Sequence, residues 1–339
     1  MTADIPIDAC ALCLESLAGE SPHDHAEGVS GVTALPCTHT NHTACLKRWE
    51  RRQRTCPVCR ALFNRFLNPE QDAEEELTPL EEAASSGDDA EVARLIAAGA
   101  DVHAGGGYAL IAAVGEGHDA VVARLLAAGA DVHTGGDGAI RTAALYGHDA
   151  VVARLIAAGA NVHAGGDDAL RAAARNGHDA VVAILLAAGA DVHAGGDNAL
   201  FAAVGEGHDA VVERLLAAGA DLHADDDGAL SFAAEIGHDA VVARLIAAGA
   251  NVHAADDVAI CMAATQGHEA IVARLIAAGA NVNGDDGKAL SGASWFGHDA
   301  VVARLIAAGA DVHAGGGEAL RMATERGHDA VVALLRAAQ

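Results

Sequence analysis

The stretch TGGDGAIRTAALYGHDAVVARLIAAGANVH, residues 134–163, contains the pattern that determines the fold of most of this chain. The segment AIRTAALY predicts a short helix ending at Gly147, and DAVVARLIAA predicts a second helix ending at Gly159. Asp149 lies near the start of the second helix, as an N-terminal cap or a partner of the helix dipole. Apolar side chains of that helix recur at the spacing of one buried face, at Val151, Val152, Leu155 and Ile156.

This pattern recurs nine times at a period of 30 residues. The copies are marked by Gly87, Gly117, Gly147, Gly177, Gly207, Gly237, Gly267, Gly297 and Gly327. Helices this short are marginal in isolation, whereas stacked copies bury a continuous core. A fixed repeat of this length therefore predicts a mainly α-helical solenoid.

The copies resemble ankyrin repeats, because the frame GH…VV..L…GA.V is typical of that family and the first copy also contains Thr78-Pro79-Leu80. The period is shorter than the usual repeat of about 33 residues. The missing residues fall between His133 and Ile140, and later copies have Ala-Leu or Ala-Ile in place of Pro-Leu. We therefore expect shortened fingers without regular β-hairpins between intact helix pairs.

Glycines and histidines recur at fixed places in the copies. Doublets such as Gly105-Gly106 lack the Lys-Ser/Thr of a phosphate-binding loop, which indicates turns. One histidine series, beginning with His118, His148 and His178, predicts hydrogen bonds at helix starts and loops, with a metal array as the alternative. A second series (His103, His133, His163 and onward) is interrupted by Asn283, and we expect its histidines to make the backbone hydrogen bonds of the usual Asn. Cys261 is expected to be a small apolar filler.

The N-terminal region has a different pattern, C-x2-C-x23-C-x-H-x2-H-x2-C-x10-C-x2-C. Its potential metal ligands are Cys10, Cys13, Cys37, His39, His42, Cys45, Cys56 and Cys59. Eight thiolate and imidazole ligands suffice for two tetrahedral Zn²⁺ ions. Six of the seven cysteines lie in this region with histidines interleaved, which favours metal binding over disulfides. The pattern therefore indicates a reducing compartment, either cytoplasmic or nuclear.

This run resembles a RING zinc finger of the variant with two central histidines, over roughly residues 8–66. The resemblance implies a small α+β domain in which two structural Zn²⁺ ions are bound in a cross-brace. One ion would be bound by Cys10, Cys13, His42 and Cys45, and the other by Cys37, His39, Cys56 and Cys59. In this family the domain holds a ubiquitin-loaded conjugating enzyme. The resemblance places Leu12, Trp49 and Pro57 in the groove for that enzyme, and it assigns Arg60 to bridging the enzyme and ubiquitin.

Charge and composition suggest where the domains begin and end. We expect the zinc finger at residues 1–66, an acidic linker at 67–77 and the solenoid at 78–339. Residues 1–69 contain 7 Lys/Arg and 7 Asp/Glu, so the other 14 basic and 40 acidic residues account for the net charge of −26. Such a body repels nucleic acid and attracts basic partners, although its acids also serve solubility. The start lacks a signal peptide, and no apolar run approaches the roughly 18 residues of a membrane span.

Variation among the copies indicates a binding face. The second helix barely changes, whereas all six aromatic residues of the solenoid lie in the finger or first helix. Aromatic and arginine side chains commonly anchor interfaces. In ankyrin domains this part lines the concave face, so we predict a protein substrate there; the alternative is that some of these side chains fill gaps between repeats. The candidates are Tyr108, Arg141, Tyr146, Arg171, Arg175, Phe201, Phe232, Trp295 and Phe296.

The sequence leaves three functions to consider. The combined resemblance predicts a RING-type ubiquitin ligase whose partners are a ubiquitin-conjugating enzyme, ubiquitin and a substrate bound by the repeats. A non-catalytic scaffold, with a structural or dimerising RING, is the alternative. A nucleic-acid-reading zinc finger is disfavoured by the ligand order and by the acidic body.

Overall fold

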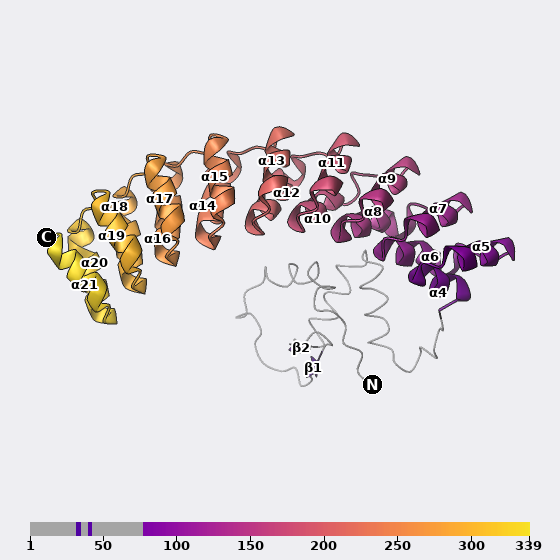
Figure 1. Ribbon diagram of the computed structural model, residues 1–339, viewed down its shortest axis with the longest axis horizontal. Helices are drawn as coiled ribbons and strands as arrows, with labels where there is room; N and C mark the ends of the chain where they lie inside the picture. Colours follow the sequence, from indigo (N-terminus) through magenta and orange to yellow (C-terminus); the bar gives the residue numbers. More distant parts are fainter. Residues whose placement is uncertain (1–31, 35–39, 43–76) are drawn as a thin grey trace. The chain divides into compact units, whose positions relative to one another are not determined.

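The computed structural model describes residues 32–34, 40–42 and 77–339, and it divides the chain into two compact units, Met1–Thr78 and Pro79–Gln339 (Figure 1). In the first unit, strand β1 (Val32–Ala34) pairs with strand β2 (Thr40–His42) in an antiparallel hairpin. Val32 lies opposite His42, and Ala34 lies opposite Thr40. Cys37 and His39 therefore fall between the two strands in sequence.

The second unit is built from nine consecutive helix pairs, as the repeat predicted, which follow one another along an arc (Figure 1). The first helices are α4 (Pro79–Ser86), α6 (Ala104–Gly115), α8 (Thr134–Tyr146), α10 (Asp168–Arg175), α12 (Ala194–Gly205), α14 (Ala224–Ile236), α16 (Ala254–Gln266), α18 (Gly284–Phe296) and α20 (Ala314–Arg326). The second helices are α5 (Asp89–Ala97), α7 (Asp119–Ala127), α9 (Asp149–Ala157), α11 (Asp179–Ala187), α13 (Asp209–Ala217), α15 (Asp239–Ala247), α17 (Glu269–Ala277), α19 (Asp299–Ala307) and α21 (Asp329–Ala337). From α6 to α16, the first helices lie on the inner side of the arc.

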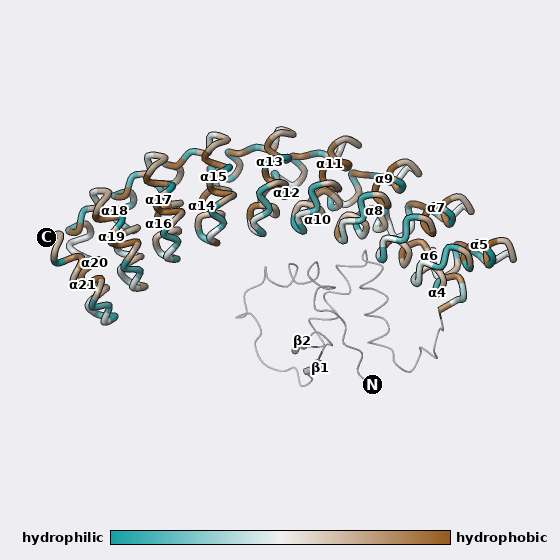
Figure 2. The backbone as a smooth tube through the Cα atoms, in the orientation of Figure 1, coloured by the Kyte–Doolittle hydropathy of each residue, from teal (hydrophilic) through white to brown (hydrophobic). Residues whose placement is uncertain are grey.

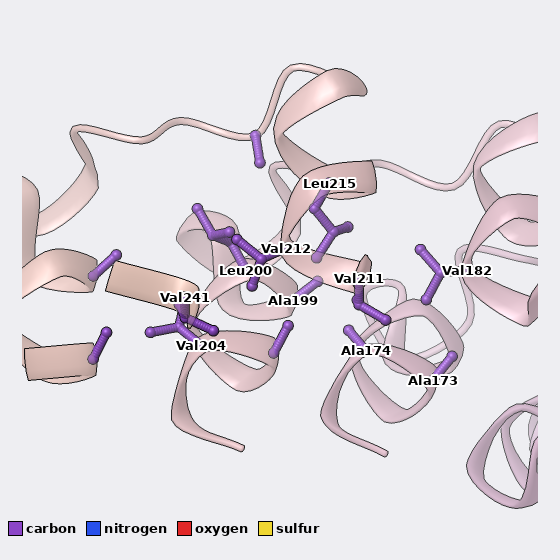
Figure 3. Packing of buried hydrophobic residues seen from close by; sticks show 14 of the residues in the cluster. Ala173, Ala174, Val182, Ala199, Leu200, Val204, Val211, Val212, Leu215 and Val241 are labelled. Carbon is purple, nitrogen blue, oxygen red and sulfur yellow. The ribbon is translucent and has the colours of Figure 1, made fainter. Parts of the chain in front are cut away.

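The core runs through the whole stack between the two helix layers. On α13, Val211, Val212 and Leu215 are buried in the same cluster as Leu200 of α12, and Figure 3 labels all four among the packed side chains. Burying one such side chain stabilises the fold by about 1.5–3 kcal/mol. In the copy used for the prediction, Val151, Val152 and Leu155 are buried and Ile156 is half-buried against the same core. The predicted apolar face is thus the packed face.

The fingers are single left-handed turns, and within residues 77–339 none contains a strand. Before the regular part of α8, Gly135, Gly136 and Asp137 have φ values of 68°, 67° and 60°. Glycine adopts this conformation without the steric cost that a Cβ brings. The prediction of shortened fingers without β-hairpins is confirmed, and the glycine doublets are turn residues.

The first histidine series ties each repeat to the one before it. The Nε2 atom of His148 donates to the carbonyl oxygen of Gly115 at 2.9 Å, and each member from His118 to His328 makes the equivalent bond to the residue 33 positions earlier. Gly117 (φ 73°) leaves room for this ring, because a Cβ there would lie 2.5 Å from Nδ1 of His148. The predicted loop hydrogen bonds are confirmed. In the described part of the chain, no cluster of three metal-binding side chains occurs.

The expectation for the second histidine series was wrong. The Nδ1 atom of His133 donates to the carboxylate of Asp137 at 2.8 Å, and this carboxylate accepts the backbone N–H of Asn161 in the next repeat at 2.9 Å. Asn283 itself accepts the equivalent backbone N–H, from Asp311 at 2.7 Å, in the copy where Gly287 replaces the aspartate. The aspartate, rather than the histidine, therefore accepts the backbone N–H that Asn283 accepts in its own copy. The same arrangement recurs at Asp167, Asp197, Asp227 and Asp257.

A third ladder joins successive second helices, from the first residue of one helix to the last turn of the next. His148 rather than Asp149 is the N-cap residue of α9, and its side chain makes no capping bond. Aspartates at this first helical position instead accept two hydrogen bonds from an arginine of the next repeat, as Asp209 does from Arg244. Asp149 lacks such a partner because Ile184 replaces the arginine. Asp149 is therefore not the N-cap residue, and its place in the first turn of α9 agrees with the other predicted role, a partner of the helix dipole.

Candidate functional site

The nine predicted binding residues of the solenoid all lie on first helices. Because these helices stack directly on one another, the structure brings the candidates onto one continuous layer. Figure 2 shows hydrophilic stretches along the inner side of the arc, and the candidates are large aromatic or arginine side chains on the first helices. They are Tyr108 on α6, Arg141 and Tyr146 on α8, Arg171 and Arg175 on α10, Phe201 on α12, Phe232 on α14, and Trp295 and Phe296 on α18.

The aromatic candidates fall into two groups by exposure. Tyr146, Phe232 and Phe296 are 45%, 38% and 55% exposed, so a large part of each side chain lies at the surface. Phe201 is half-buried and packs against the core. The ring of Trp295 is half-buried, and the guanidinium of Arg326 lies 3.7 Å from its centroid, a cation–π contact. The gap-filling alternative therefore fits Phe201 and Trp295 better than it fits the exposed rings.

Two of the three arginine candidates already have acidic neighbours. Arg171 pairs with Asp168 of the same helix at 2.8 Å, and Arg175 lies 3.5 Å from Glu206 of the next repeat. Arg141 is half-buried and forms no ion pair with any of the residues that the structure describes. The arginine candidates therefore lie on α8 and α10, and the charges of Arg171 and Arg175 are partly neutralised.

Two exposed side chains of the same layer were missed by the sequence analysis. Ile236 on α14 is 41% exposed, and Met262 on α16 is 36% exposed. Ile236 lies four residues after Phe232, on the same helix face, and Met262 occupies the position of Phe232 one repeat later. A search for exposed helix positions of any apolar type, rather than for aromatics alone, would have found them.

The free thiol and the helices of the described region provide no further candidate site. Cys261 is buried on α16, and burial raises the pKa of its thiol to about 11, so it is an inert filler as expected. Among the described helices, none combines the length and apolar character that crossing a membrane requires.

The predicted zinc-finger residues lie outside the described residues, apart from the backbone of His42 at the end of β2. This holds for the other seven ligands and for the groove residues and the bridging arginine, which are Cys10, Leu12, Cys13, Cys37, His39, Cys45, Trp49, Cys56, Pro57, Cys59 and Arg60. Their roles and the pairing of the ligands stay predictions that the RING resemblance implies.

Comparison with known families agrees with the architecture. Residues 140–226 and 230–316 match the family described as ankyrin repeats (three copies). The two matches together cover just over half of the chain, so this chain belongs to the ankyrin-repeat family.

The particular arrangement is a RING-H2 zinc finger followed by these repeats, because residues 8–60 match the RING-H2 zinc finger domain. A stretch of 56 residues is 34% identical to "E3 ubiquitin-protein ligase RHF1A" of Arabidopsis thaliana. That similarity covers 16% of this chain and spans 13% of the length of the relative.

The chemistry of the donor set fits the metal that the RING-H2 match implies. Six cysteine thiolates and two histidine imidazoles are the ligands that Zn²⁺ prefers, and two CxxC pairs supply the close spacing. A site with four protein ligands has no open position for substrate, so zinc here would stabilise the fold of the finger. Zinc binding by this region follows from the match.

Proposed function

We propose that this protein is a RING-type ubiquitin-protein ligase that positions a ubiquitin-loaded conjugating enzyme and recruits its substrate through the ankyrin repeats. The observation that carries this proposal is the match of residues 8–60 to the RING-H2 domain. Within that match, the residues that the resemblance assigns to the conjugating enzyme and ubiquitin occur together: Leu12, Trp49, Pro57 and Arg60. The 34% identity to a protein named as an E3 ligase supports the same function.

The proposed chemistry is transfer by orientation. Ubiquitin passes from the conjugating enzyme to a substrate amine without a covalent intermediate on this chain, because the ligase holds the reactants in a productive geometry. Two structural Zn²⁺ ions, one bound by Cys10, Cys13, His42 and Cys45 and the other by Cys37, His39, Cys56 and Cys59, would make the finger rigid.

The assigned groove residues have side chains suited to their task. Leu12, Trp49 and Pro57 would form a shallow apolar groove that binds the conjugating enzyme. Arg60 would donate hydrogen bonds to the enzyme and to ubiquitin at once, since a guanidinium has five donors in a fixed plane. The thiolate ligands require reducing conditions, which favours the cytoplasm or nucleus.

The repeats would supply the substrate. Their stacked first helices present exposed Tyr146, Phe232 and Phe296, and exposed aromatic rings are typical anchors of protein interfaces. A substrate bound there is tethered to the loaded enzyme, which raises the effective concentration of its lysines.

Reconstituted autoubiquitination tests the proposal against the scaffold alternative. Full-length protein loaded with zinc is mixed with activating enzyme, a panel of conjugating enzymes, ubiquitin and ATP. We expect ubiquitin chains or adducts on the protein with at least one conjugating enzyme, and their loss in Cys37→Ser, which removes a zinc ligand.

A matched control is Cys261→Ser, which alters a buried thiol far along the chain from the ligands. It is expected to retain activity. If no conjugating enzyme supports transfer while the protein contains zinc and is folded, the ligase proposal fails and the scaffold remains.

A further inference from the structure

The fingers of three consecutive repeats differ from all the others. In five fingers the left-handed turn begins with two glycines, at residues 105–106, 135–136, 165–166, 195–196 and 315–316. In the other three it begins with Asp225, Ala255-Asp256 and Asp285-Asp286, which lie near the starts of α14, α16 and α18 and before their regular parts. These three fingers carry acidic residues at their exposed tips.

The acidic fingers are conformationally unfavourable. Asp225, Asp256 and Asp286 have φ values of 50°, 56° and 53°, where a Cβ meets the backbone and where the other fingers have glycine. Within the described residues, Asp225 and Asp256 make no hydrogen bond or ion pair that offsets this cost. Contacts within the described residues therefore give no reason for aspartate at positions 225 and 256.

The same three repeats also hold most of the exposed apolar surface. Six large hydrophobic side chains are exposed in the part of the chain that the structure describes, and four of them lie on α14, α16 and α18. Phe232 and Ile236 share one face of α14, and Met262 takes the place of Phe232 on the adjoining helix α16. Phe232 lies across the preceding repeat, because a Cβ on Gly205 would come within 2.8 Å of its ring.

Charge identifies the kind of partner that fits. On the fingers and first helices of these three repeats, the single basic residue is Lys288, and it pairs with Asp285 at 2.6 Å. Arg244 and Arg274 belong to the second helices and pair with Asp209 and Asp239 there. The surface is thus apolar with an acidic border, in contrast to the arginines on α8 and α10.

We propose that Phe232, Ile236 and Met262, bordered by Asp225, Asp256 and Asp286, form a docking surface for a basic amphipathic segment of a partner protein. We call this set the acidic-finger patch. Apolar side chains of the segment would cover the exposed residues of α14 and α16, while its Lys and Arg side chains face the finger tips. The inference deepens the proposed function, in which this partner is the substrate, but the binding itself needs no ubiquitin transfer.

A defined peptide tests the docking surface directly. The probe is a labelled peptide of leucine and lysine with its leucines at helical spacing, and binding to the full-length, zinc-loaded protein is followed by fluorescence anisotropy. Two comparison peptides are a scrambled version of the same composition and a version with glutamate in place of lysine. We expect binding of the first peptide only, weakening as salt rises.

The first protein variant gives the acidic fingers the glycine that other fingers already have. Asp225→Gly, Asp256→Gly and Asp286→Gly, combined in one chain, restore the glycine of the other copies and relieve backbone strain, so the fold is kept. We expect the affinity for the basic peptide to fall by about tenfold or more. The control is Asp149→Asn, Asp299→Asn and Asp329→Asn, which removes the same charge from exposed second-helix starts and is expected to change little.

The apolar part of the patch has its own variant. Ile236→Gln with Met262→Gln removes two exposed apolar side chains and is expected to weaken binding by a similar factor. Three results would each overturn the proposal. The scrambled peptide could bind as tightly as the amphipathic one, the finger variant and its control could lose the same affinity, or neither the finger variant nor the apolar variant could change the affinity. If the protein ubiquitinates itself but does not bind the peptide, the acidic-finger patch is rejected and the ligase proposal stands. If it binds the peptide but shows no autoubiquitination, the protein is a scaffold with this patch.

Discussion

The second helices and the first helices of this solenoid have taken opposite roles. The second helices repeat the buried pattern of Val211, Val212 and Leu215 almost unchanged, and several neighbouring ones are joined by arginine–aspartate pairs such as Arg244 and Asp209. The first helices share the core but vary at their exposed positions, where Phe232 and Ile236 lie. Because nearest-neighbour contacts supply most of the stability of a repeat protein, the exposed inner positions are free to change for recognition.

Truncating one side chain from each layer gives the largest contrast. Leu215→Ala leaves a cavity in the fully buried core of α13 and should lower the free energy of unfolding by about 2–5 kcal/mol. Phe232→Ala removes a partly exposed ring and should cost no more than about 1 kcal/mol. Urea denaturation followed by circular dichroism measures both, and equal losses would show that the two layers do not differ as described.

A single finger provides a sharper contrast between two aspartates. Asp227 is 8% exposed, accepts the backbone N–H of Asn251 at 3.0 Å and binds His223 at 2.9 Å. Asp227→Gly leaves that N–H without its acceptor and should cost about 1–3 kcal/mol. Asp225→Gly in the same turn relieves strain and should gain up to about 1 kcal/mol. The difference in thermal denaturation midpoint between the variants checks this; a loss in both would contradict it.

The ion-pair ladder should give the smallest effect, and that effect depends on pH. Two hydrogen bonds from Arg244 lower the pKa of Asp209 below the ordinary aspartate value of about 3.9. A lowered folded pKa means that the pair stabilises fully above the unfolded value and loses its effect as pH falls through the folded one. Asp209→Asn should therefore cost about 0.2–1 kcal/mol at neutral pH and nothing in strong acid.

Asp149 provides the matched control for this ladder. It occupies the same helix position, but Ile184 stands where the pairing arginine would be. Asp149→Asn should therefore lose only the helix-dipole contribution, which Asp209→Asn loses as well, and should cost less than Asp209→Asn at neutral pH. Stability measured by urea denaturation across the acid range would contradict the account if both variants lost the same amount at neutral pH.

The repeat pattern was sufficient to predict the helix pairs, their number and the absence of hairpins. Period and apolar spacing depend on local chemistry and on burial, and both are visible along one copy, as at Val151 and Leu155. The shortened loop between His133 and Ile140 has too few residues for a hairpin, and it forms the left-handed turn that Gly135 and Gly136 permit.

The ladders between repeats could not be predicted in the same way. His133 and Asp137 are four residues apart, but the acceptor role of Asp137 appears only when the backbone of Asn161 is placed beside it. Exposure could not be predicted from residue type either: Phe201 packs on the core, whereas Phe232, one position further along the repeat, is exposed. Tertiary packing, rather than residue identity, decides such cases.

Discharge of ubiquitin from a preloaded conjugating enzyme onto free lysine tests the central claim most directly, because it isolates transfer from substrate binding. We expect the full-length, zinc-loaded protein to accelerate discharge and Arg60→Ala to slow it strongly, while Arg65→Ala, outside the matched finger, retains the wild-type rate. Wild-type discharge by a folded Arg60→Ala protein, or no acceleration by the wild-type protein with any conjugating enzyme, would contradict the account.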